Sequence, residues 1–175
     1  PIEDLIGIGN MINVSTLSLS GQAIETLPAE IGNLSNLRQL DIAANNLTSL
    51  PPEISNLSNL TGIWLNFNNL TSIPSEIWNL SNLVSLGLTN TNITSIPAEI
   101  SNLSNLTTLS LEDNNLTSLP SEVSNLSNLN VVFIQNNSNF STIPPAPSAS
   151  SISVYRYGDQ ISCPDVVAAG WVCSN

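Results

Sequence analysis

The sequence predicts an α/β repeat fold: a right-handed solenoid with a parallel β-sheet on its concave side and short helical or 3-10 turns on its convex side. Three observations predict it. One phrase returns every 23 residues, as in NLTSLPPEISNLSNL from Asn46 and NLTSIPSEIWNLSNL from Asn69, and a period of roughly 20 to 50 residues is typical of stacked repeats. Within each repeat a short stretch alternates apolar and polar residues, as a half-buried strand does. A Pro-Glu-Ile segment follows, with apolar residues at helical spacing.

Each repeat opens with the predicted strand. In LRQLDIA, alternation places Leu40 and Ile42 on one face and Gln39, Asp41 and Ala43 on the other. Coils that stack at roughly 4.8 Å would join their inward Leu and Ile residues into one continuous core. The other face of every strand is therefore expected to form the concave surface.

A buried amide is expected after each strand. An Asn that turns the chain inward can bind backbone groups of the adjacent coils, and such contacts repeat as a ladder. The ladder is expected to be weaker where Gln or Thr replaces Asn. The predicted positions are Gln22, Asn45, Asn68, Thr91, Asn114 and Asn137.

The second half of each repeat is expected to be a short helical turn. In LTSLPPEI, Leu47 and Leu50 point inward, and Pro51 or Pro52 begins the turn at a position that tolerates Pro. One Glu per coil falls in the first turn. These carboxylates could attract Ca²⁺, but we favour the interpretation that they complement the helix dipole. They are Glu30, Glu53, Glu76, Glu99 and Glu122.

The aligned strands share the pattern LxxLxLxxNxL, and each repeat finishes as LxxLPxEIxxLxxL. The chain therefore resembles the leucine-rich repeat family over about residues 5 to 145, in its 22–24-residue bacterial and plant-like varieties. The resemblance implies the same parallel solenoid. The aligned segments begin at Val14, Leu37, Leu60, Leu83, Leu106 and Leu129.

Three regions follow from the repeat. Residues 1–13 match only part of a repeat and are expected to be a partial repeat or an N-terminal cap; residues 14–145 are the 23-residue repeats; residues 146–175 are expected to be a C-terminal cap. In this cap, SISVYRYGD is expected to supply the last strand. Cys163 and Cys173 close one short loop, which favours a disulfide and an oxidising compartment. That loop, with Trp171, is expected to cover the end of the core, while two reduced thiols remain the alternative.

Composition excludes several functions. Charged residues make up 9% of the chain, Arg38 and Arg156 are its only basic residues, and the formal net charge is −11. Nucleic-acid binding needs clustered cations, so it is not expected. No apolar run approaches the roughly 20 residues needed to span a bilayer, so no membrane insertion is expected. Without His or Lys the usual general bases are missing, and we expect no enzyme activity, no cofactor and no metal site.

One outward strand position on the concave face differs from the others. Trp64 interrupts small polar residues, and its predicted neighbours are Asp41 and Gly87, with Gly62 beside it. Small neighbours are expected to leave the indole faces open for a sugar or a partner side chain. The hypothesis is a protein or glycan site at Trp64, Asp41, Asn66, Phe67 and Gln39, with a second aromatic spot at Phe133 and Tyr155.

A second surface has its own regularity. Beyond the Asn ladder, four successive coils repeat N-x-T-S without a charge, which is similar to the ice-binding faces of repeat-built antifreeze proteins. Ice binding is therefore an alternative function. Its columns are Thr48, Thr71, Thr94 and Thr117, then Ser49, Ser72, Ser95 and Ser118.

A third alternative is a structural spacer or subunit that assembles into a larger surface protein or filament. Repeated Asn-x-Ser/Thr sites would predict a heavy sugar coat in a eukaryotic secretory protein, so we favour a bacterial origin. The main hypothesis is an extracellular or cell-surface recognition module, secreted and non-enzymatic, that binds a protein or glycan.

Overall fold

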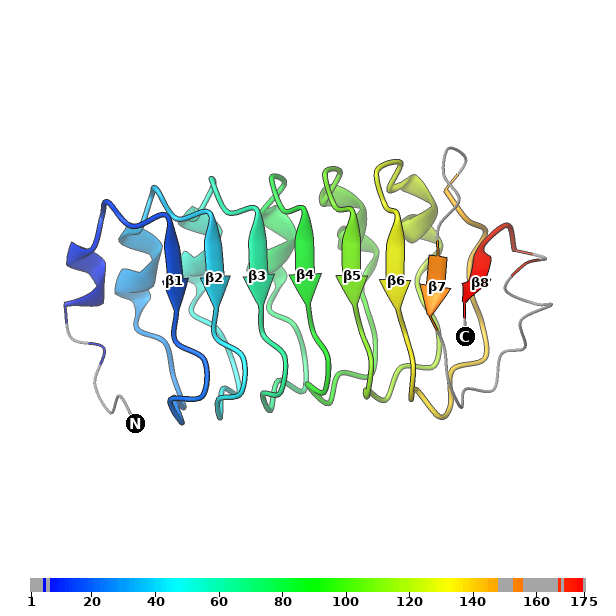
Figure 1. Ribbon diagram of the computed structural model, residues 1–175, viewed down its shortest axis with the longest axis horizontal. Coiled ribbons are helices and arrows are strands. Elements are labelled where there is room, and N and C mark those ends of the chain that lie inside the picture. Colours follow the sequence, from blue (N-terminus) through cyan, green and yellow to red (C-terminus); the bar gives the residue numbers. More distant parts are fainter. Residues whose placement is uncertain (1–4, 6, 148–152, 156–166, 168, 175) are drawn as a thin grey trace.

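The computed structural model describes residues 5, 7–147, 153–155, 167 and 169–174. Within them, parallel strands form a single sheet whose order follows the chain (Figure 1). Each strand is three residues long and lies beside the next at a 23-residue spacing up to β6. The strands are β1 (Thr16–Ser18), β2 (Gln39–Asp41), β3 (Gly62–Trp64), β4 (Ser85–Gly87), β5 (Thr108–Ser110), β6 (Val131–Phe133), β7 (Ser153–Tyr155) and β8 (Val172–Ser174).

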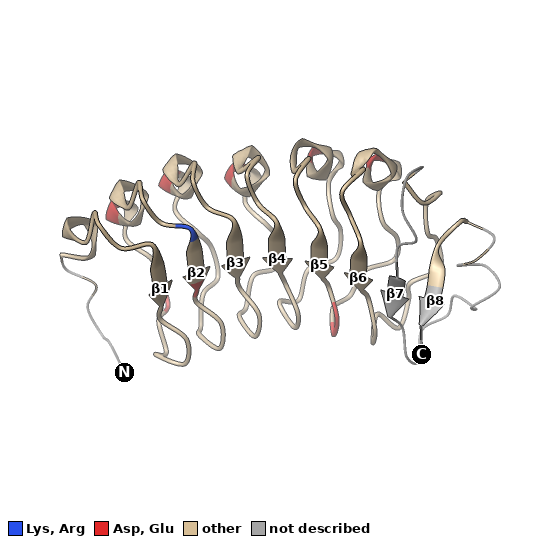
Figure 2. Ribbon diagram, turned by 45° about the horizontal axis from the view of Figure 1, so that its top comes forward, with Lys and Arg blue, Asp and Glu red and all other residues tan. Residues whose placement is uncertain are grey.

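Short 3-10 helices form the other side of the solenoid, as predicted (Figure 1). From η2 to η6 each is capped by an extended Pro and ends where a Leu backbone N–H donates to the carbonyl of the buried Ile or Val three residues earlier. Each of these also carries its Glu in the first turn, as Figure 2 shows in red. The helices are η1 (Ile8–Asn10), η2 (Ala29–Asn33), η3 (Pro52–Asn56), η4 (Ser75–Asn79), η5 (Ala98–Asn102) and η6 (Ser121–Asn125).

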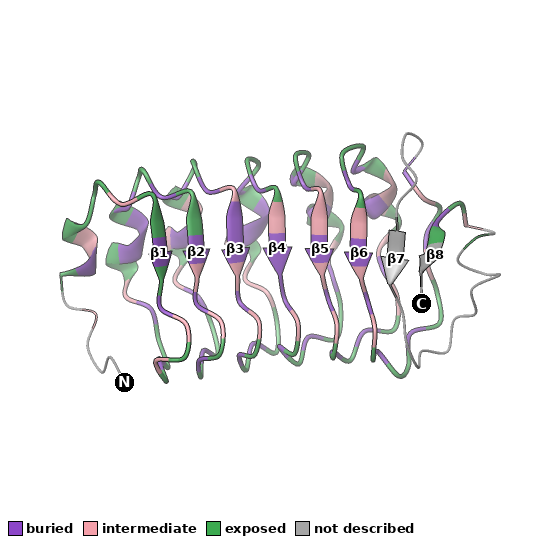
Figure 3. Ribbon diagram, viewed as in Figure 1, coloured by how far each residue is buried: buried purple, intermediate pink, exposed green. Residues whose placement is uncertain are grey.

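The core runs the length of the solenoid between the sheet and the helices. The middle residue of each of β1 to β6 is buried, whereas most flanking residues face solvent wholly or in part (Figure 3). The predicted inward residues Leu40, Ile42 and Leu47 have no exposed surface, and Leu50 is buried. Each such side chain stabilises the fold by about 1.5–3 kcal/mol through removal of apolar surface from water. Stacking of coils therefore provides the stability that one coil lacks.

The buried Asn ladder is confirmed. The Asn68 side chain accepts from the Leu47 N–H at Oδ1 (3.0 Å) and donates from Nδ2 to Ile42 O (2.9 Å) and Leu65 O (2.8 Å). It thereby satisfies backbone groups of its own coil and of the preceding one, which would be costly to bury unpaired. The same arrangement recurs at Asn45, Asn114 and Asn137.

The ladder weakens at the two predicted departures. The Gln22 side chain donates only to a carbonyl two residues earlier (3.1 Å). The Thr91 hydroxyl donates to Leu88 O (2.8 Å) but reaches no carbonyl of the preceding coil. In both coils the next residue, Ala23 or Asn92, adopts a positive φ (59° and 65°), which the equivalent residues of the Asn coils do not. Loss of the Asn therefore changes the backbone locally.

The C-terminal region differs from expectation in one respect. The segment around Ser153–Tyr155 forms β7, as predicted, but it is not the last strand. Strand β8 pairs with it in parallel and comes from the segment expected to be a closing loop. Sheet pairing therefore extends one strand further than the repeat pattern indicated.

Trp171 closes the core at this end. Its indole is buried with the core cluster, and its Nε1 donates to Pro144 O (2.7 Å). The expected Cys163–Cys173 disulfide lies outside the described residues, since only the backbone of Cys173 is described. The disulfide and the cap boundaries therefore remain predictions.

Candidate functional site

A hollow of about 490 Å³ lies on the concave face over β1, β2 and β3, and we name it the concave hollow. The sheet creates it because outward side chains of three successive strands point to the same side. Four residues of the predicted site line it, together with three small ones that the prediction did not include. The lining residues are Thr16, Ser18, Gln39, Asp41, Ala43, Trp64 and Asn66.

Trp64 is the largest side chain of the concave hollow. It pairs laterally with Asp41 on one side and with Gly87 on the other, as predicted. The indole lies against both glycines: a Cβ on Gly62 would be 2.7 Å from Trp64 Cη2, and one on Gly87 would be 3.0 Å from Trp64 Cδ1. The expectation that both indole faces stay open is therefore wrong. Because both glycines lack a Cβ atom, the indole packs directly against the sheet. One side of the ring is therefore covered by the backbone, and Trp64 is half-buried.

Asp41 supplies the charge of the concave hollow. Its Oδ2 accepts from Ser18 Oγ (3.2 Å) and its Oδ1 accepts from the Ala43 N–H (3.0 Å). These bonds fix the carboxylate beside Trp64 and leave further acceptor positions free on both oxygens. No basic side chain is among the described residues that line the concave hollow.

Asn66 lines the concave hollow beside Trp64, since atoms of both side chains lie within 3.0 Å of the position that a Cβ on Gly87 would take. Its Oδ1 accepts from the Thr89 N–H (2.9 Å), and this bond fixes the orientation of the whole side-chain amide. The close approach of this amide to Gly87 explains the second glycine, since a Cβ there would be 2.8 Å from Asn66 Oδ1. Gln39 on β2 is exposed. The concave hollow thus combines one aromatic ring, one carboxylate and two amides.

Phe67 lies at the turn that follows β3 and does not line the concave hollow. Its side chain is 55% exposed and its φ is +57°. A bulky residue at positive φ is rare and strained. The equivalent positions of other coils also have positive φ but carry Gly21, Ala44, Asn90, Asp113 and Asn136.

The second predicted aromatic spot is separate. Phe133 on β6 is half-buried and pairs in register with Tyr155 on β7, whose side chain is not described. Strands β4 and β5 lie between Phe133 and Trp64. The two aromatic groups therefore do not form one site.

The alternative ice-binding columns lie in the segments that follow the turns at the C-terminal ends of the strands. The Thr column Thr48, Thr71, Thr94 and Thr117 is exposed, as are Ser49, Ser72 and Ser95. Two features interrupt the lattice. Ser118 is half-buried and forms an isolated bridge with Thr142. Asn92 has its positive φ and donates from Nδ2 to Asn69 Oδ1 (3.0 Å).

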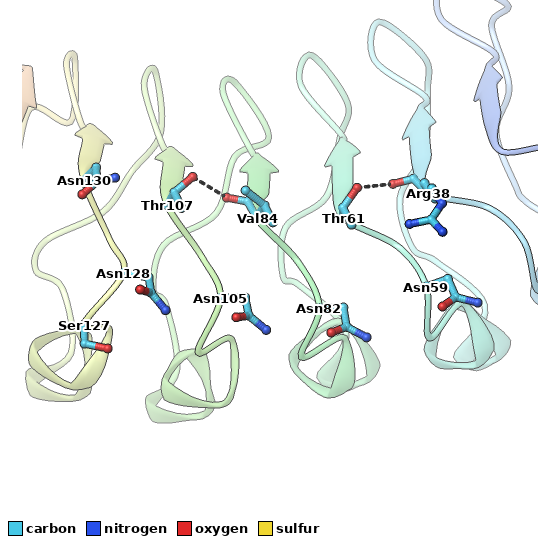
Figure 4. A pocket seen from close by; sticks show the side chains of 10 residues that line it. All are labelled: Arg38, Asn59, Thr61, Asn82, Val84, Asn105, Thr107, Ser127, Asn128 and Asn130. Atoms are coloured by element: carbon cyan, nitrogen blue, oxygen red, sulfur yellow. Dashed lines mark hydrogen bonds between the residues drawn. The ribbon is translucent and has the colours of Figure 1, made fainter.

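A groove of about 740 Å³ runs along the opposite edge, between the helices and the strands (Figure 4). One Asn per coil donates from Nδ2 to a Ser carbonyl of the preceding coil, as in Asn82 to Ser58 O (2.8 Å). This second ladder accounts for the repeated LSNL phrase. Arg38 lies at one end of the groove and is its only charged lining residue among those described. Folding alone explains this surface, since the amides bind backbone.

The described residues contain no group of three or more side chains arranged to hold a metal ion. In the same part of the chain, no helix has the length and apolar character needed to cross a membrane.

Comparison with known proteins identifies the architecture. A model described as a leucine-rich repeat region matches residues 3–86 and 74–146. A search of curated protein sequences finds no match. A leucine-rich repeat protein of Leptospira interrogans superposes with a TM-score of 0.64 at 24% identity, over 95% of this chain and 55% of that one. The functional domain of InlJ from Listeria monocytogenes, described as including a cysteine ladder, superposes with a TM-score of 0.73 at 24% identity, over 87% of this chain and 32% of that one. The chain thus spans about half and about a third of these two structures.

Proposed function

Since this chain belongs to the leucine-rich repeat family, whose members are typically non-enzymatic binding modules, we propose that it is an extracellular recognition module. Its ligand is a protein or a glycan, held in the concave hollow against Trp64. The observation that carries this proposal is the half-buried indole, which lies on two glycines on a face made mostly of small polar residues.

Energetic arguments support this choice of site. Glycine weakens a strand interior, and it often marks a place where another group approaches closely. Trp is enriched at binding hot spots because it offers a large rigid surface at low entropic cost. An indole that is already immobilised against the sheet loses little further freedom when a ligand covers it. The extracellular location rests on the predicted Cys163–Cys173 disulfide.

Tryptophan fluorescence offers a direct test. The chain has three Trp residues, and Trp78 and Trp171 are each only 2% exposed. Quenching by acrylamide, a neutral quencher, therefore reports mainly on Trp64. A panel of glycans and surface proteins is screened for a ligand that protects this residue from quenching.

The matched variants are Trp64→Leu and Phe133→Leu, which truncate aromatic residues of the same face on different strands. We expect Trp64→Leu to lose ligand binding and Phe133→Leu to keep it. Equal binding by both variants would place the ligand elsewhere and refute the site.

A second candidate function, ice binding, is supported by the four exposed Thr residues in successive coils. Thermal hysteresis that Thr71→Tyr and Thr94→Tyr abolish would support it. Hysteresis that is absent from the wild type would exclude it. Assembly into a larger surface structure is a third candidate, which sedimentation of the full-length protein tests.

A further inference from the structure

We propose that the partner of the concave hollow is a basic protein segment, whose Arg side chain stacks on Trp64 and pairs with Asp41. The inference rests on the proposed function and assigns a ligand class to its site. It follows from where the single charge of the concave hollow lies and from the charge of the whole chain.

The geometry brings an aromatic face and a carboxylate together. Asp41 and Trp64 are direct partners in the β2–β3 register, so their backbones are about 4.8 Å apart. A planar guanidinium can stack on the outward face of an indole and still direct N–H groups to a neighbouring carboxylate. Asp41 is held in place for this by Ser18 and Ala43.

Among the outward strand residues in register with Trp64, a carboxylate occurs only at Asp41, directly beside the indole. In the part of this column from β1 to β6, Asp41 is the only charged side chain, and it lies immediately beside the only Trp. No described basic residue lines the concave hollow to neutralise it. From β1 to β6 the column reads Ser18, Asp41, Trp64, Gly87, Ser110 and Phe133, and it continues with Tyr155 on β7 and Ser174 on β8.

The charge of the whole chain favours the same partner. The formal net charge is −11, and a field of one sign accelerates association with partners of the opposite sign. The only blue segment of Figure 2 lies just before β2 at Arg38, the single basic residue among those described. Arg38 lines the edge groove rather than the concave hollow. A basic segment therefore meets no repulsive side chain among the residues of the site.

Arginine fits better than lysine. Its guanidinium is flat, matches a carboxylate with two parallel hydrogen bonds and is more weakly hydrated than an ammonium group. A neutral sugar would also stack on Trp64, and its hydroxyl groups can donate to Asp41. It carries no charge, however, so salt should weaken its binding far less than that of an Arg peptide. The salt dependence of binding therefore separates the two ligand classes.

The test begins with a selection from a phage-displayed library of random peptides on the immobilised wild-type protein. We expect enriched peptides to be net basic and to contain Arg. Their affinity, measured through Trp64 fluorescence in the wild type and by calorimetry in the variants, is expected to fall about tenfold in Trp64→Leu, as for a desolvated cation–π contact. Replacement of the peptide Arg by citrulline, which keeps the shape and removes the charge, is expected to have a similar effect.

Asp41→Asn is compared with Glu99→Gln. Both variants remove one negative charge, but Glu99 is exposed in η5 on the opposite side of the solenoid. We expect Asp41→Asn to weaken binding about tenfold and Glu99→Gln less than twofold. The exposed carboxylate of Glu99 is far from the concave hollow, and salt screens its interaction with a ligand bound there. Salt should weaken binding as well, since the Debye length falls from about 30 Å at 0.01 M to about 3 Å at 1 M.

Three outcomes would overturn the inference: an empty selection, enriched peptides without basic residues, or equal affinities of Asp41→Asn and Glu99→Gln. A panel of neutral oligosaccharides runs in parallel. Binding of one of them that requires Trp64, with or without Asp41, would refute the basic partner and leave the proposed site intact. Ligands that bind Trp64→Leu as tightly as the wild type would instead refute the proposed function.

Discussion

Thr91 is the point at which the buried ladder can be repaired by one substitution. In the preceding coils an Asn side chain accepts the N–H of a residue 21 positions earlier, as Asn68 does for Leu47 (3.0 Å). The shorter Thr91 side chain makes no hydrogen bond with the equivalent N–H of Leu70, and no other partner of that N–H is found among the described residues. Leu70 has no exposed surface, so bulk water does not reach this N–H. We predict that Thr91→Asn increases stability.

The magnitude follows from the groups that change partners. A buried polar group without a partner costs about 1–3 kcal/mol, and Asn would satisfy the Leu70 N–H through Oδ1. The variant loses the hydroxyl contact of Thr91 to Asn114 Oδ1 (3.2 Å), which is worth about 0.5–1.5 kcal/mol. The net expected gain is about 1 kcal/mol.

Equilibrium urea unfolding followed by circular dichroism measures this gain. With a slope m of about 2–3 kcal/mol/M, the midpoint should rise by about 0.4 M at unchanged m. The matched control is Asn68→Thr, which imposes the Thr arrangement on an intact coil. It removes the acceptor of the Leu47 N–H and the donor to Ile42 O, whereas the hydroxyl keeps a bond to Leu65 O as Thr91 does to Leu88 O. A loss of about 2 kcal/mol is therefore expected. A midpoint that stays constant in both variants would refute the role assigned to the ladder.

Two further predictions concern the coil that contains Trp64. Phe67→Asn should raise the melting temperature, because it relieves about 1 kcal/mol of strain at positive φ. The reverse change, Asn90→Phe at the equivalent turn, should lower the melting temperature. A lower melting temperature for Phe67→Asn would contradict the strain argument. Gly62→Ala places a Cβ 2.7 Å from the indole, so it should displace Trp64, increase its quenching by acrylamide and weaken ligand binding. Ser85→Ala, at the laterally paired position of β4, should change none of these, and unaltered quenching in Gly62→Ala would show that the ring does not rest on the glycine.

The strands and the ladder could be predicted because both follow from a strict period. Alternation within a strand fixes which side chains face outward, so the lateral neighbours of Trp64 were correctly identified as Asp41 and Gly87. The weak ladder at Thr91 was also predictable, because Thr has fewer hydrogen-bonding groups than Asn. In these cases the local chemistry of one residue decides the structure.

Other features depend on neighbours or lie outside the period. Trp78 is fully buried in η4, although the equivalent positions of other coils carry Ser55 and Ser101; its burial depends on packing that spacing does not reveal. Strand β8 comes from a segment without the repeat pattern, so nothing in the sequence indicated its pairing. The orientation of Trp64 was missed for a different reason. Glycine neighbours predict open space beside the indole, whereas in the structure the ring itself fills that space.

The strain at Phe67 has a signal in the sequence. The residues at equivalent turns are mostly Gly, Asn and Asp, the types that tolerate a positive φ. A Phe in that column therefore departs from the residue types that the turn favours, and the repeat alignment alone is sufficient to detect it. Strain of this kind persists where the surrounding structure holds it, and it is frequent at ligand sites.

The coil of β3 departs from the repeat in three ways that each oppose stability. Gly62 weakens a strand interior, Phe67 occupies a strained turn with a 55% exposed ring, and Trp64 leaves apolar surface on the concave face. Neighbouring coils show that Ser85 and Asn90 serve the first two positions without these costs. The core of the coil gains nothing from the substitutions, because its inward residues Ile63 and Leu65 remain fully buried Ile and Leu as in the other coils. Folding alone therefore does not account for these three residues, which is consistent with the proposed ligand at Trp64.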